Sequence, residues 1–217
     1  MTRWDVASGG PLPLHIGNEY LKTMASAAAD ANPSAVLGGA SVLFLGLGGG
    51  TLPSLFARQQ HARLVCVDID EAVAELAVSH CGLDASRVQV EVGDALDYVS
   101  AAADDTYDLV FVDIFDAENL CPLSFTTPAF ADSVNRVLTS GGAAVMNHHC
   151  GNPAEDGLLE ATEAAWRDAF GGGVTTRRTR YQANAVLSAT KGPPQAGPGA
   201  VDVAREVEWP WDVRLRL

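Results

Sequence analysis

The chain has 217 residues, which suits one α/β domain with modest additions and allows a buried core without disulfides or metals. Apolar residues make up 47% of it and charged residues 19%, and the formal net charge is −13 at pH 7. This acidity argues against nucleic-acid binding, which requires clustered lysine and arginine. It is compatible either with a plain acidic surface or with a basic substrate.

The sequence shows no targeting or membrane-spanning segment. No apolar run approaches the ~20 residues of a transmembrane helix, and no basic start precedes an apolar signal-peptide core. Four cysteines, Cys66, Cys81, Cys121 and Cys150, lack CxxC spacing, which favours free thiols in a reducing compartment. We therefore expect a cytoplasmic protein with no membrane partner.

In chain order, the sequence begins with an arm and a helix. Residues 1–17 are rich in glycine and proline and are typical of an irregular segment. The alanine-rich stretch at 19–30 predicts a helix that Asn32-Pro33 closes. From residue 41 onward, strands and helices are expected to alternate. The strands are expected at 41–45, 63–67, 88–92, 107–113 and 143–147, and the helices at 52–60, 71–80, 95–102, 128–138 and 155–170.

The C-terminal third is expected to close the sheet. A turn at Ser140-Gly141-Gly142 precedes the fifth strand, and strands at 174–178 and 184–189 form a hairpin through Tyr181 and Gln182. Residues 191–199 are expected to be a mobile loop, and the tail with Trp209 and Trp211 is expected to pack on the body.

This order of elements predicts the fold class. Five successive β-α units and a closing hairpin predict an α/β fold with a doubly wound, mostly parallel seven-stranded sheet and a final antiparallel strand. This is the Rossmann-like fold of class I methyltransferases. The expected division is an arm and helix at 1–40, a methyltransferase-like domain at 41–190, and a loop and tail at 191–217 that pack on the same domain.

Glycines follow the first predicted strand, at the sheet edge where such folds bind ligands. Gly46, Gly48 and Gly50 let the chain turn tightly and bring backbone N–H groups close to a ligand. A purely structural turn or a dinucleotide site would look similar, although Thr51 stands where the dinucleotide fingerprint has its last glycine. The turn alone predicts a ligand without specifying it.

Carboxylates end the next two predicted strands. Asp68 lies 22 positions after the first glycine of the turn and can accept hydrogen bonds from two ribose hydroxyls, or it is a loop residue of no special role. Asp70 is expected to cap the following helix. Asp94 can accept from the exocyclic amine of adenine. Ile69 and Ala95, which follow the two carboxylates, are assigned to the same cofactor site.

The fourth strand ends in a second pair of carboxylates, Asp113 and Asp116. Paired carboxylates beside a sulfonium cofactor can hold an amine nucleophile and accept its proton as it attacks. Both are assigned catalytic roles, and Asp113 also touches the cofactor. For Asp113, a helix cap or turn residue is the structural alternative. Tyr20 and Asn147 are expected to line the substrate side together with Asp116.

Two other clusters are assigned no chemistry. His148 and His149 are adjacent on a strand and point to opposite faces, so they do not share one metal ion, and no metal site is predicted. Arg177, Arg178 and Arg180 form a basic cluster that is interpreted as a solvated strand edge rather than a contact for an acidic partner.

The motifs together resemble the spermidine synthase superfamily of methyltransferase-like folds. The resemblance rests on Val67-Asp68-Ile69-Asp70-Glu71, Gly93-Asp94-Ala95 and Val112-Asp113-Ile114-Phe115-Asp116. In polyamine aminopropyltransferases, the equivalents of Asp68 and Asp94 hold the ribose and adenine of decarboxylated S-adenosylmethionine. The equivalents of Asp113 and Asp116 serve the amine substrate.

Other stretches are similar to the C-terminal domain of the methyltransferase-like family that modifies translation elongation factor 1A, which methylates a protein α-amine. These stretches are Tyr20-Leu21-Lys22-Thr23-Met24, Gly46-Leu47-Gly48-Gly49-Gly50-Thr51-Leu52-Pro53, Asp94-Ala95-Leu96-Asp97-Tyr98 and Cys121-Pro122. Ala117 replaces the proline that aminopropyltransferases carry, and only residues 1–40 precede the first predicted strand. Both departures argue against a polyamine substrate.

The resemblance implies an S-adenosylmethionine-dependent methyltransferase acting on an amine of a small molecule or a protein, with a homodimer as one assembly that it allows. Aminopropyl transfer from decarboxylated S-adenosylmethionine is the alternative activity. A non-catalytic binding module that keeps the fold is the third hypothesis.

Overall fold

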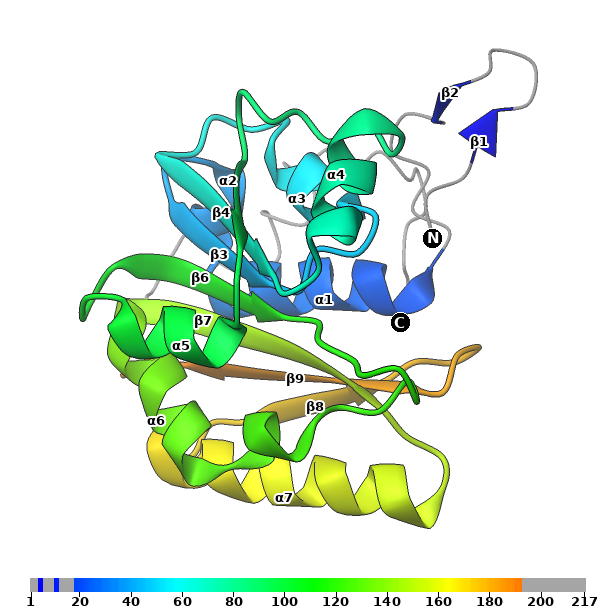
Figure 1. Ribbon diagram of the computed structural model, residues 1–217. Coiled ribbons are helices and arrows are strands. Elements are labelled where there is room, and N and C mark those ends of the chain that lie inside the picture. The colour runs from blue at the N-terminus through cyan, green and yellow to red at the C-terminus, as the bar shows by residue number, and fades with distance from the viewer. Residues whose placement is uncertain (1–3, 6–9, 12–17, 193–217) are drawn as a thin grey trace.

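A seven-stranded sheet forms the centre of the protein, whose computed structural model describes residues 4–5, 10–11 and 18–192 (Figure 1). The strand order is β5-β4-β3-β6-β7-β9-β8. The pairs from β5 to β7 are parallel, and β9 runs antiparallel to both β7 and β8. The strands are β3 (Ser41–Leu45), β4 (Arg63–Asp68), β5 (Gln89–Val92), β6 (Tyr107–Val112), β7 (Leu138–His149), β8 (Thr175–Arg178) and β9 (Asn184–Thr190). The predicted doubly wound, mostly parallel sheet is thereby confirmed.

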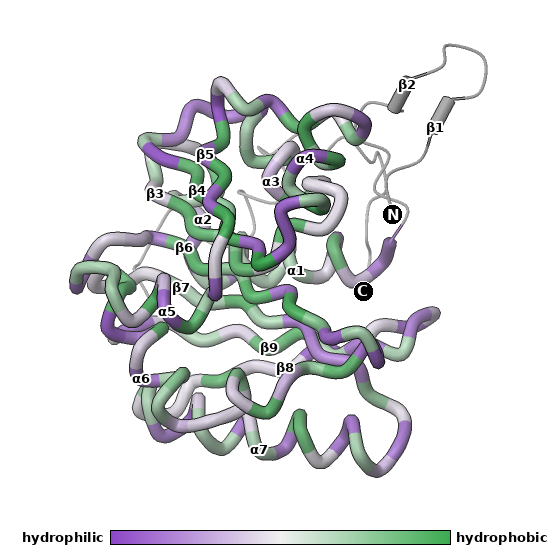
Figure 2. The backbone as a smooth tube through the Cα atoms, in the orientation of Figure 1, coloured by the Kyte–Doolittle hydropathy of each residue, from purple (hydrophilic) through white to green (hydrophobic). Residues whose placement is uncertain are grey.

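Helices cover both faces of the sheet (Figure 1). One face carries α1 (Glu19–Ala31), α2 (Pro33–Leu37), α3 (Thr51–Phe56) and α4 (Glu71–Ser79). The other carries α5 (Ala95–Ala101), α6 (Pro128–Val137), α7 (Pro153–Ala169) and the 3-10 helix η1 (Leu123–Thr126). The central strands are hydrophobic and α7 alternates between polar and apolar residues (Figure 2), as expected for strands covered on both sides by amphipathic helices.

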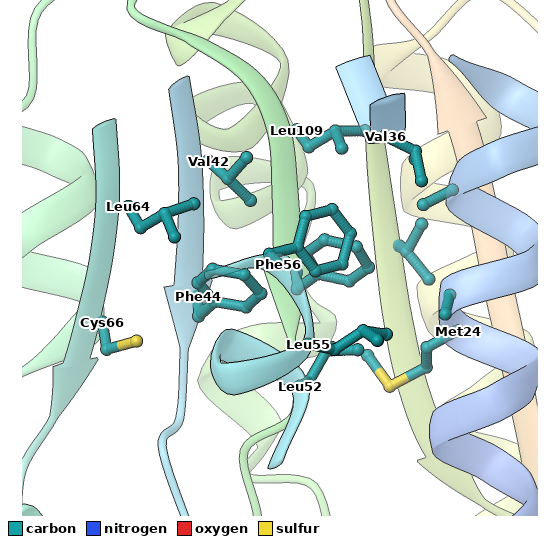
Figure 3. Close-up of a cluster of buried hydrophobic side chains, with 14 of the residues drawn as sticks. Met24, Val36, Val42, Phe44, Leu52, Leu55, Phe56, Leu64, Cys66 and Leu109 are labelled. Atoms are coloured by element: carbon teal, nitrogen blue, oxygen red, sulfur yellow. The ribbon is translucent and has the colours of Figure 1, made fainter. Parts of the chain in front are cut away.

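Aromatic side chains fix the two strands that deliver the site. Phe44 of β3 and Phe111 of β6 stack with ring centroids 5.2 Å apart, and Phe56 of α3 packs edge-on against both (Figure 3). Such edge-to-face and offset arrangements are favourable beyond the area they bury. This packing holds the carboxyl ends of β3 and β6 side by side.

One sequence prediction about the irregular regions is wrong. The glycines at 141 and 142 lie inside β7 rather than in a turn before it, at a register shift between Tyr107 and Leu109 of β6. A Cβ on Gly142 would lie 2.9 Å from the Thr139 carbonyl oxygen, so the residue permits a bulge within a continuous strand. Asn32 ends α1, as predicted. The short helix α2, which was not predicted, begins at Pro33, because Asn32 accepts a hydrogen bond from the Ala35 N–H at 3.1 Å and caps the new helix.

Two short strands pair near the N-terminus of the chain. Within the expected irregular arm, β1 (Trp4–Asp5) and β2 (Gly10–Pro11) pair antiparallel. The expected loop from residue 193 onward and the packing of the tail with Trp209 and Trp211 lie outside the described residues. Within the described part of the chain, no helix is long and apolar enough to cross a membrane.

Candidate active site

The glycine turn passes directly over the end of β6. Gly46 donates its N–H to the Val67 carbonyl at 2.8 Å and has a φ of 88°. A Cβ at this position would lie 2.3 Å from the Asp113 carbonyl oxygen, so only glycine allows the two backbones to approach. Gly48 and Gly50 also have positive φ values, 50° and 65°, and Gly50 begins α3. All three predicted glycines therefore shape this turn.

Asp68 ties the glycine turn to the end of β4. Its Oδ2 accepts the Leu47 N–H at 2.8 Å, and its Oδ1 accepts the Asp70 N–H at 3.1 Å. Each carboxylate oxygen has a second lone pair, so the side chain retains capacity for a ligand hydroxyl. Asp70 accepts the Ala72 N–H at 2.9 Å and caps α4, which confirms the prediction.

The end of β5 contributes a further carboxylate. Asp94 caps α5 by accepting the Leu96 N–H at 2.7 Å through Oδ1. At the end of the neighbouring strand, Ile69 follows β4. Its side chain is 74% exposed, which is unusual for a large apolar residue. Both residues face one cavity, so an exposed apolar surface and a carboxylate are available to the same ligand.

The cavity has a volume of about 720 Å³ and lies at the carboxyl ends of the parallel strands. A smaller hollow of about 60 Å³ shares Tyr20 and Asp113 with it and extends along the glycine turn. Among the residues predicted for the site, Gly50 and Asn147 do not line the large cavity. Those that do are Tyr20, Gly46, Gly48, Asp68, Ile69, Asp94, Ala95, Asp113 and Asp116.

Asp113 is held by side chains rather than by backbone groups. Asn147 donates its Nδ2–H to Asp113 Oδ1 at 2.8 Å, and the Tyr20 hydroxyl forms a second hydrogen bond with the carboxyl group. Burial raises the pKa of Asp113, whereas these two hydrogen bonds and the charge of His149 act in the opposite direction. Burial and the neighbouring Asp113 raise the pKa of Tyr20, so its hydroxyl keeps its proton and serves as the donor.

The hairpin between β8 and β9 positions Tyr20. The Glu19 carboxylate accepts the N–H groups of Arg180 and Tyr181, each at 2.7 Å. Gln182 Oε1 accepts the Tyr20 N–H at 3.0 Å. We call this set of contacts between Glu19, Tyr20 and residues 180–182 the α1 clasp. Sequence reasoning missed Glu19 and Gln182, because more than 160 positions separate the partners and neither has a local signature.

Asp116 lies at the rim of the cavity and is exposed. Its Oδ1 accepts the N–H groups of Glu118 at 3.1 Å and Leu120 at 2.8 Å, which closes the loop after β6. The side chain therefore has a structural role in this loop, which the sequence reasoning did not assign to it, and it also faces the cavity.

The two adjacent histidines lie in different environments. His148 is buried, and its burial followed by the charge of His149 lowers its pKa to about 4. The His149 ring packs on Phe115 with centroids 4.4 Å apart, and its Nδ1 lies 3.3 Å from the amide nitrogen of Asn119. Among the described residues, no group of three or more His, Cys, Asp or Glu side chains could hold a metal ion.

Two arginines of the predicted basic cluster are paired with acidic side chains. Arg177 forms an ion pair with Asp30 of α1 at 2.7 Å, and Arg178 forms one with Asp156 of α7 at 3.3 Å. These contacts join the edge strand β8 to helices on the two faces of the sheet. The third, Arg180, lies over the Tyr181 ring, 5.3 Å from its centroid.

Comparison with known proteins places this fold and cavity in a family. Residues 17–170 match the spermine/spermidine synthase domain, and the chain therefore belongs to that family. This confirms the resemblance to the spermidine synthase superfamily that the strand-end motifs indicated.

The curated proteins that are similar in sequence to this chain include two kinds of transferase. The eEF1A lysine and N-terminal methyltransferase of Mus musculus is 29% identical over 182 residues, which cover 77% of this chain and 25% of that protein. The polyamine aminopropyltransferase of Vibrio vulnificus is 29% identical over 134 residues, or 60% of this chain and 43% of that protein. The chain thus spans about a quarter of the length of the first of these curated relatives and less than half of the second.

Solved structures agree with the fold. Human methyltransferase-like protein 13 in complex with SAH has a TM-score of 0.72 and 27% identity, and the match covers 88% of this chain and 91% of that one. A probable spermidine synthase from Corynebacterium glutamicum has a TM-score of 0.71 at 24% identity, covering 89% of this chain and 72% of that one. The fold is therefore that of the class I methyltransferases, as the order of elements predicted.

Proposed function

We propose that the protein is an S-adenosylmethionine-dependent methyltransferase that acts on an amine of a small molecule or a protein. Its membership of a family whose members include methyltransferases and aminopropyltransferases supports a transferase in general. The observation that carries the proposal is the placement of Asp113, a half-buried carboxylate fixed by Asn147 and Tyr20, in the cavity that Asp68 and Asp94 line.

The residues of the cavity fit an adenosyl ligand. The volume of about 720 Å³ lies within the range of about 300–1,000 Å³ that is usual for ligand sites. Asp68 would accept hydrogen bonds from the ribose hydroxyls, and Asp94 would accept one from the adenine amine. The exposed Ile69 side chain would pack on the adenine ring, and Ala95 would leave room beside it. Gly46 and Gly48 let the turn approach the methionine end closely, and Gly50 lets it continue into α3.

The bound sulfonium supplies an electrophilic methyl carbon, so that an N–C bond forms as the S–C bond breaks. Asp113 accepts a hydrogen bond from the acceptor amine, directs its lone pair and takes up the proton that is released. Tyr20 and Asn147 hold this carboxylate in place, and Asp116 at the rim attracts a cationic amine. The residues act mainly by positioning, which can contribute most of the rate for such a displacement.

Aminopropyl transfer to a polyamine is the second candidate. The family match and the Vibrio vulnificus relative support it, and so does the pair Asp113 and Asp116 facing one cavity. Ala117 argues against it, because aminopropyltransferases resembling this chain carry proline after the second aspartate. The two activities require different donors, since one donor has a carboxylate that the other lacks.

Titration calorimetry separates these candidates. We expect S-adenosylmethionine to bind more tightly than its decarboxylated form, and labelled methyl groups to appear on a peptide with free amines rather than on putrescine. A clear preference for the decarboxylated donor would favour the second candidate. No binding of either donor at millimolar concentration would leave the third hypothesis, a non-catalytic module.

The first prediction concerns the cofactor side. Asp68→Ala removes the proposed ribose acceptor, and we expect it to weaken binding of S-adenosylhomocysteine about ten- to a hundredfold, since a hydrogen bond to a charged group is worth about 1.5–3 kcal/mol. Asp84→Ala is the matched control: it removes a carboxylate that accepts the Ser86 N–H at 2.9 Å outside the cavity, and we expect little change in affinity. Unchanged binding by Asp68→Ala would contradict the cofactor assignment.

A further inference from the structure

Two buried asparagines connect Asp113 to β9, the last strand in the sequence. Asn184, the first residue of β9, donates its Nδ2–H to Asn147 Oδ1 at 3.1 Å. Asn147 in turn donates its own Nδ2–H to Asp113 Oδ1 at 2.8 Å. The two asparagines are 5% and 1% exposed, so the hydrogen bond between them is shielded from water. The proposed mechanism does not use Asn184.

The two hydrogen bonds, from Asn184 to Asn147 and from Asn147 to Asp113, run in one direction. An amide oxygen only accepts hydrogen bonds and an amide nitrogen only donates them. If the Asn147 amide were turned over, its nitrogen would face the Asn184 nitrogen and its oxygen would face Asp113. The first contact would place two donors together, and the second would be favourable only with a protonated Asp113. Asn184 thus selects the orientation in which Asn147 presents a donor to Asp113.

Backbone contacts fix Asn184 itself. The Asn184 carbonyl accepts the Thr179 N–H at 2.9 Å and the Thr179 hydroxyl at 3.1 Å, and the Asn184 N–H donates to the same hydroxyl at 3.2 Å. Thr179 Oγ1 also contacts the Gln182 carbonyl, within the hairpin that joins the α1 clasp. The backbone of Asn184, from which this amide projects, is therefore anchored by the same hairpin that positions Tyr20.

We propose that Asn184 is a positioning residue which, through the Asn147 amide, keeps Asp113 a hydrogen-bond acceptor and so able to take the proton of the amine. The role assigned to Asp113 in this statement rests on the proposed function. The direction of the two asparagine hydrogen bonds does not rest on the proposed function, because it is set in the folded protein without any ligand. Burial favours the protonated carboxyl, and the asparagine pair opposes that tendency.

Other groups also act on the Asp113 carboxyl. Tyr20 of α1 donates through its hydroxyl, and His149 of β7 contributes its charge when protonated. Neither residue takes part in the hydrogen bond between Asn184 and Asn147. A difference between wild type and a variant at Asn184 therefore reports on the asparagine pair, because the other two contributions are common to both proteins.

The test is a direct titration of Asp113 by NMR, with carbon-13 at the aspartate carboxyl groups and no cofactor present. The Asp113 signal is identified by its loss in Asp113→Asn. We expect Asn147→Leu to raise the Asp113 pKa by about one pH unit or more, a tenfold change in the ionisation constant, because it removes a hydrogen bond to the carboxylate. We expect Asn184→Leu to raise the same pKa by a smaller amount, because the Asn147 amide then has no fixed orientation.

Asn135→Leu is the matched control, since the Asn135 amide bonds the Ala169 carbonyl at 2.9 Å on the opposite face of the sheet. It should leave the Asp113 pKa unchanged. An unchanged Asp113 pKa in Asn184→Leu overturns the proposal, whatever Asn147→Leu does. If Asn184→Leu does not fold, Asn184→Ala removes the same donor without added bulk and without a new charge near Asp113. We expect a raised Asp113 pKa there too, and an unchanged value again overturns the proposal. Failure to bind an adenosyl donor would instead contradict the proposed function and leave the titration result standing.

Discussion

The two halves of the cavity hold their carboxylates in different ways. On the proposed cofactor side, Asp68 and Asp94 accept hydrogen bonds from backbone N–H groups of adjoining loops and helix ends. On the proposed acceptor side, Asp113 is held by the side chains of Tyr20 and Asn147, which come from α1 and β7. Backbone donors follow from the strand-end geometry of the fold, whereas side-chain donors require particular residues on distant elements. The cofactor half is thus determined locally, and the acceptor half by tertiary packing.

The largest expected effect would separate the two halves by function. Asp113→Asn removes the proton acceptor, and we expect it to reduce the transfer rate by about 10²–10⁴-fold, the usual contribution of general base catalysis. Affinity for S-adenosylhomocysteine should remain, because Asp68 and Asp94 are unchanged. The rate is measured in single turnovers at saturating S-adenosylmethionine, with the acceptor that supports methyl transfer.

The control for this variant is Asp84→Asn, which alters a carboxylate that bonds Ser86 outside the cavity. It should keep the wild-type rate. An Asp113→Asn protein that loses donor affinity as strongly as turnover would remove the distinction between the two halves.

A pair of glycine variants tests where the halves meet. Gly46→Ala places a Cβ 2.3 Å from the Asp113 carbonyl oxygen, and we expect a loss of about 3 kcal/mol or more in the free energy of unfolding, from the close contact and from the positive φ. Gly48→Ala has a positive φ but open space around its Cβ, so we expect a loss of only about 1–2 kcal/mol. Urea unfolding measures both, and equal losses would contradict the close approach of the turn to β6.

The last prediction concerns how stability depends on pH through His148, on the other face of β7. In the unfolded chain His148 takes up a proton near its ordinary pKa of 6.5, whereas in the folded protein burial lowers that pKa to about 4. The unfolded state therefore binds more protons between these values, and stability falls as the pH falls from about 6.5 to about 4. The loss from this group is at most about 3 kcal/mol.

His148→Leu should remove that part of the pH dependence. Urea unfolding at pH 7 and at pH 4.5 gives the difference for each protein, and the difference should be smaller for the variant. An equal difference in both proteins would show that His148 is not the group that titrates.

Local signals in the sequence predicted most of the fold and the carboxylates of the cavity. Apolar runs that end in glycine or aspartate are typical of parallel strands with a ligand edge, and the cap formed by Asp70 follows from its position before a helix. The cavity then brought together residues predicted from four separate strand ends. The roles assigned to these residues remain predictions until binding and transfer are measured.

The remaining features depend on contacts that no local pattern records. Glu19 and Asn184 act through partners on other elements, so their types alone did not distinguish them from solvent-exposed or capping residues. The glycines of β7 have the composition of a turn, and only pairing with β6 makes them a bulge. Asp116 closes its own loop, a role that the sequence reasoning did not assign to it.

The α1 clasp also has a consequence for the order in which the protein assembles during synthesis. The chain up to residue 117 already contains Asp68, Asp94, Asp113 and the strands that carry them. Tyr20, made much earlier, gains its anchors only when residues 180–182 emerge, and the Asn147 amide gains its partner only with residue 184. Contacts so far apart in sequence form late, because closing a long loop costs entropy before the contact offsets it. The carboxylates of the proposed donor side are therefore made before the contacts that fix the proposed acceptor side, and β9 supplies the last of those contacts.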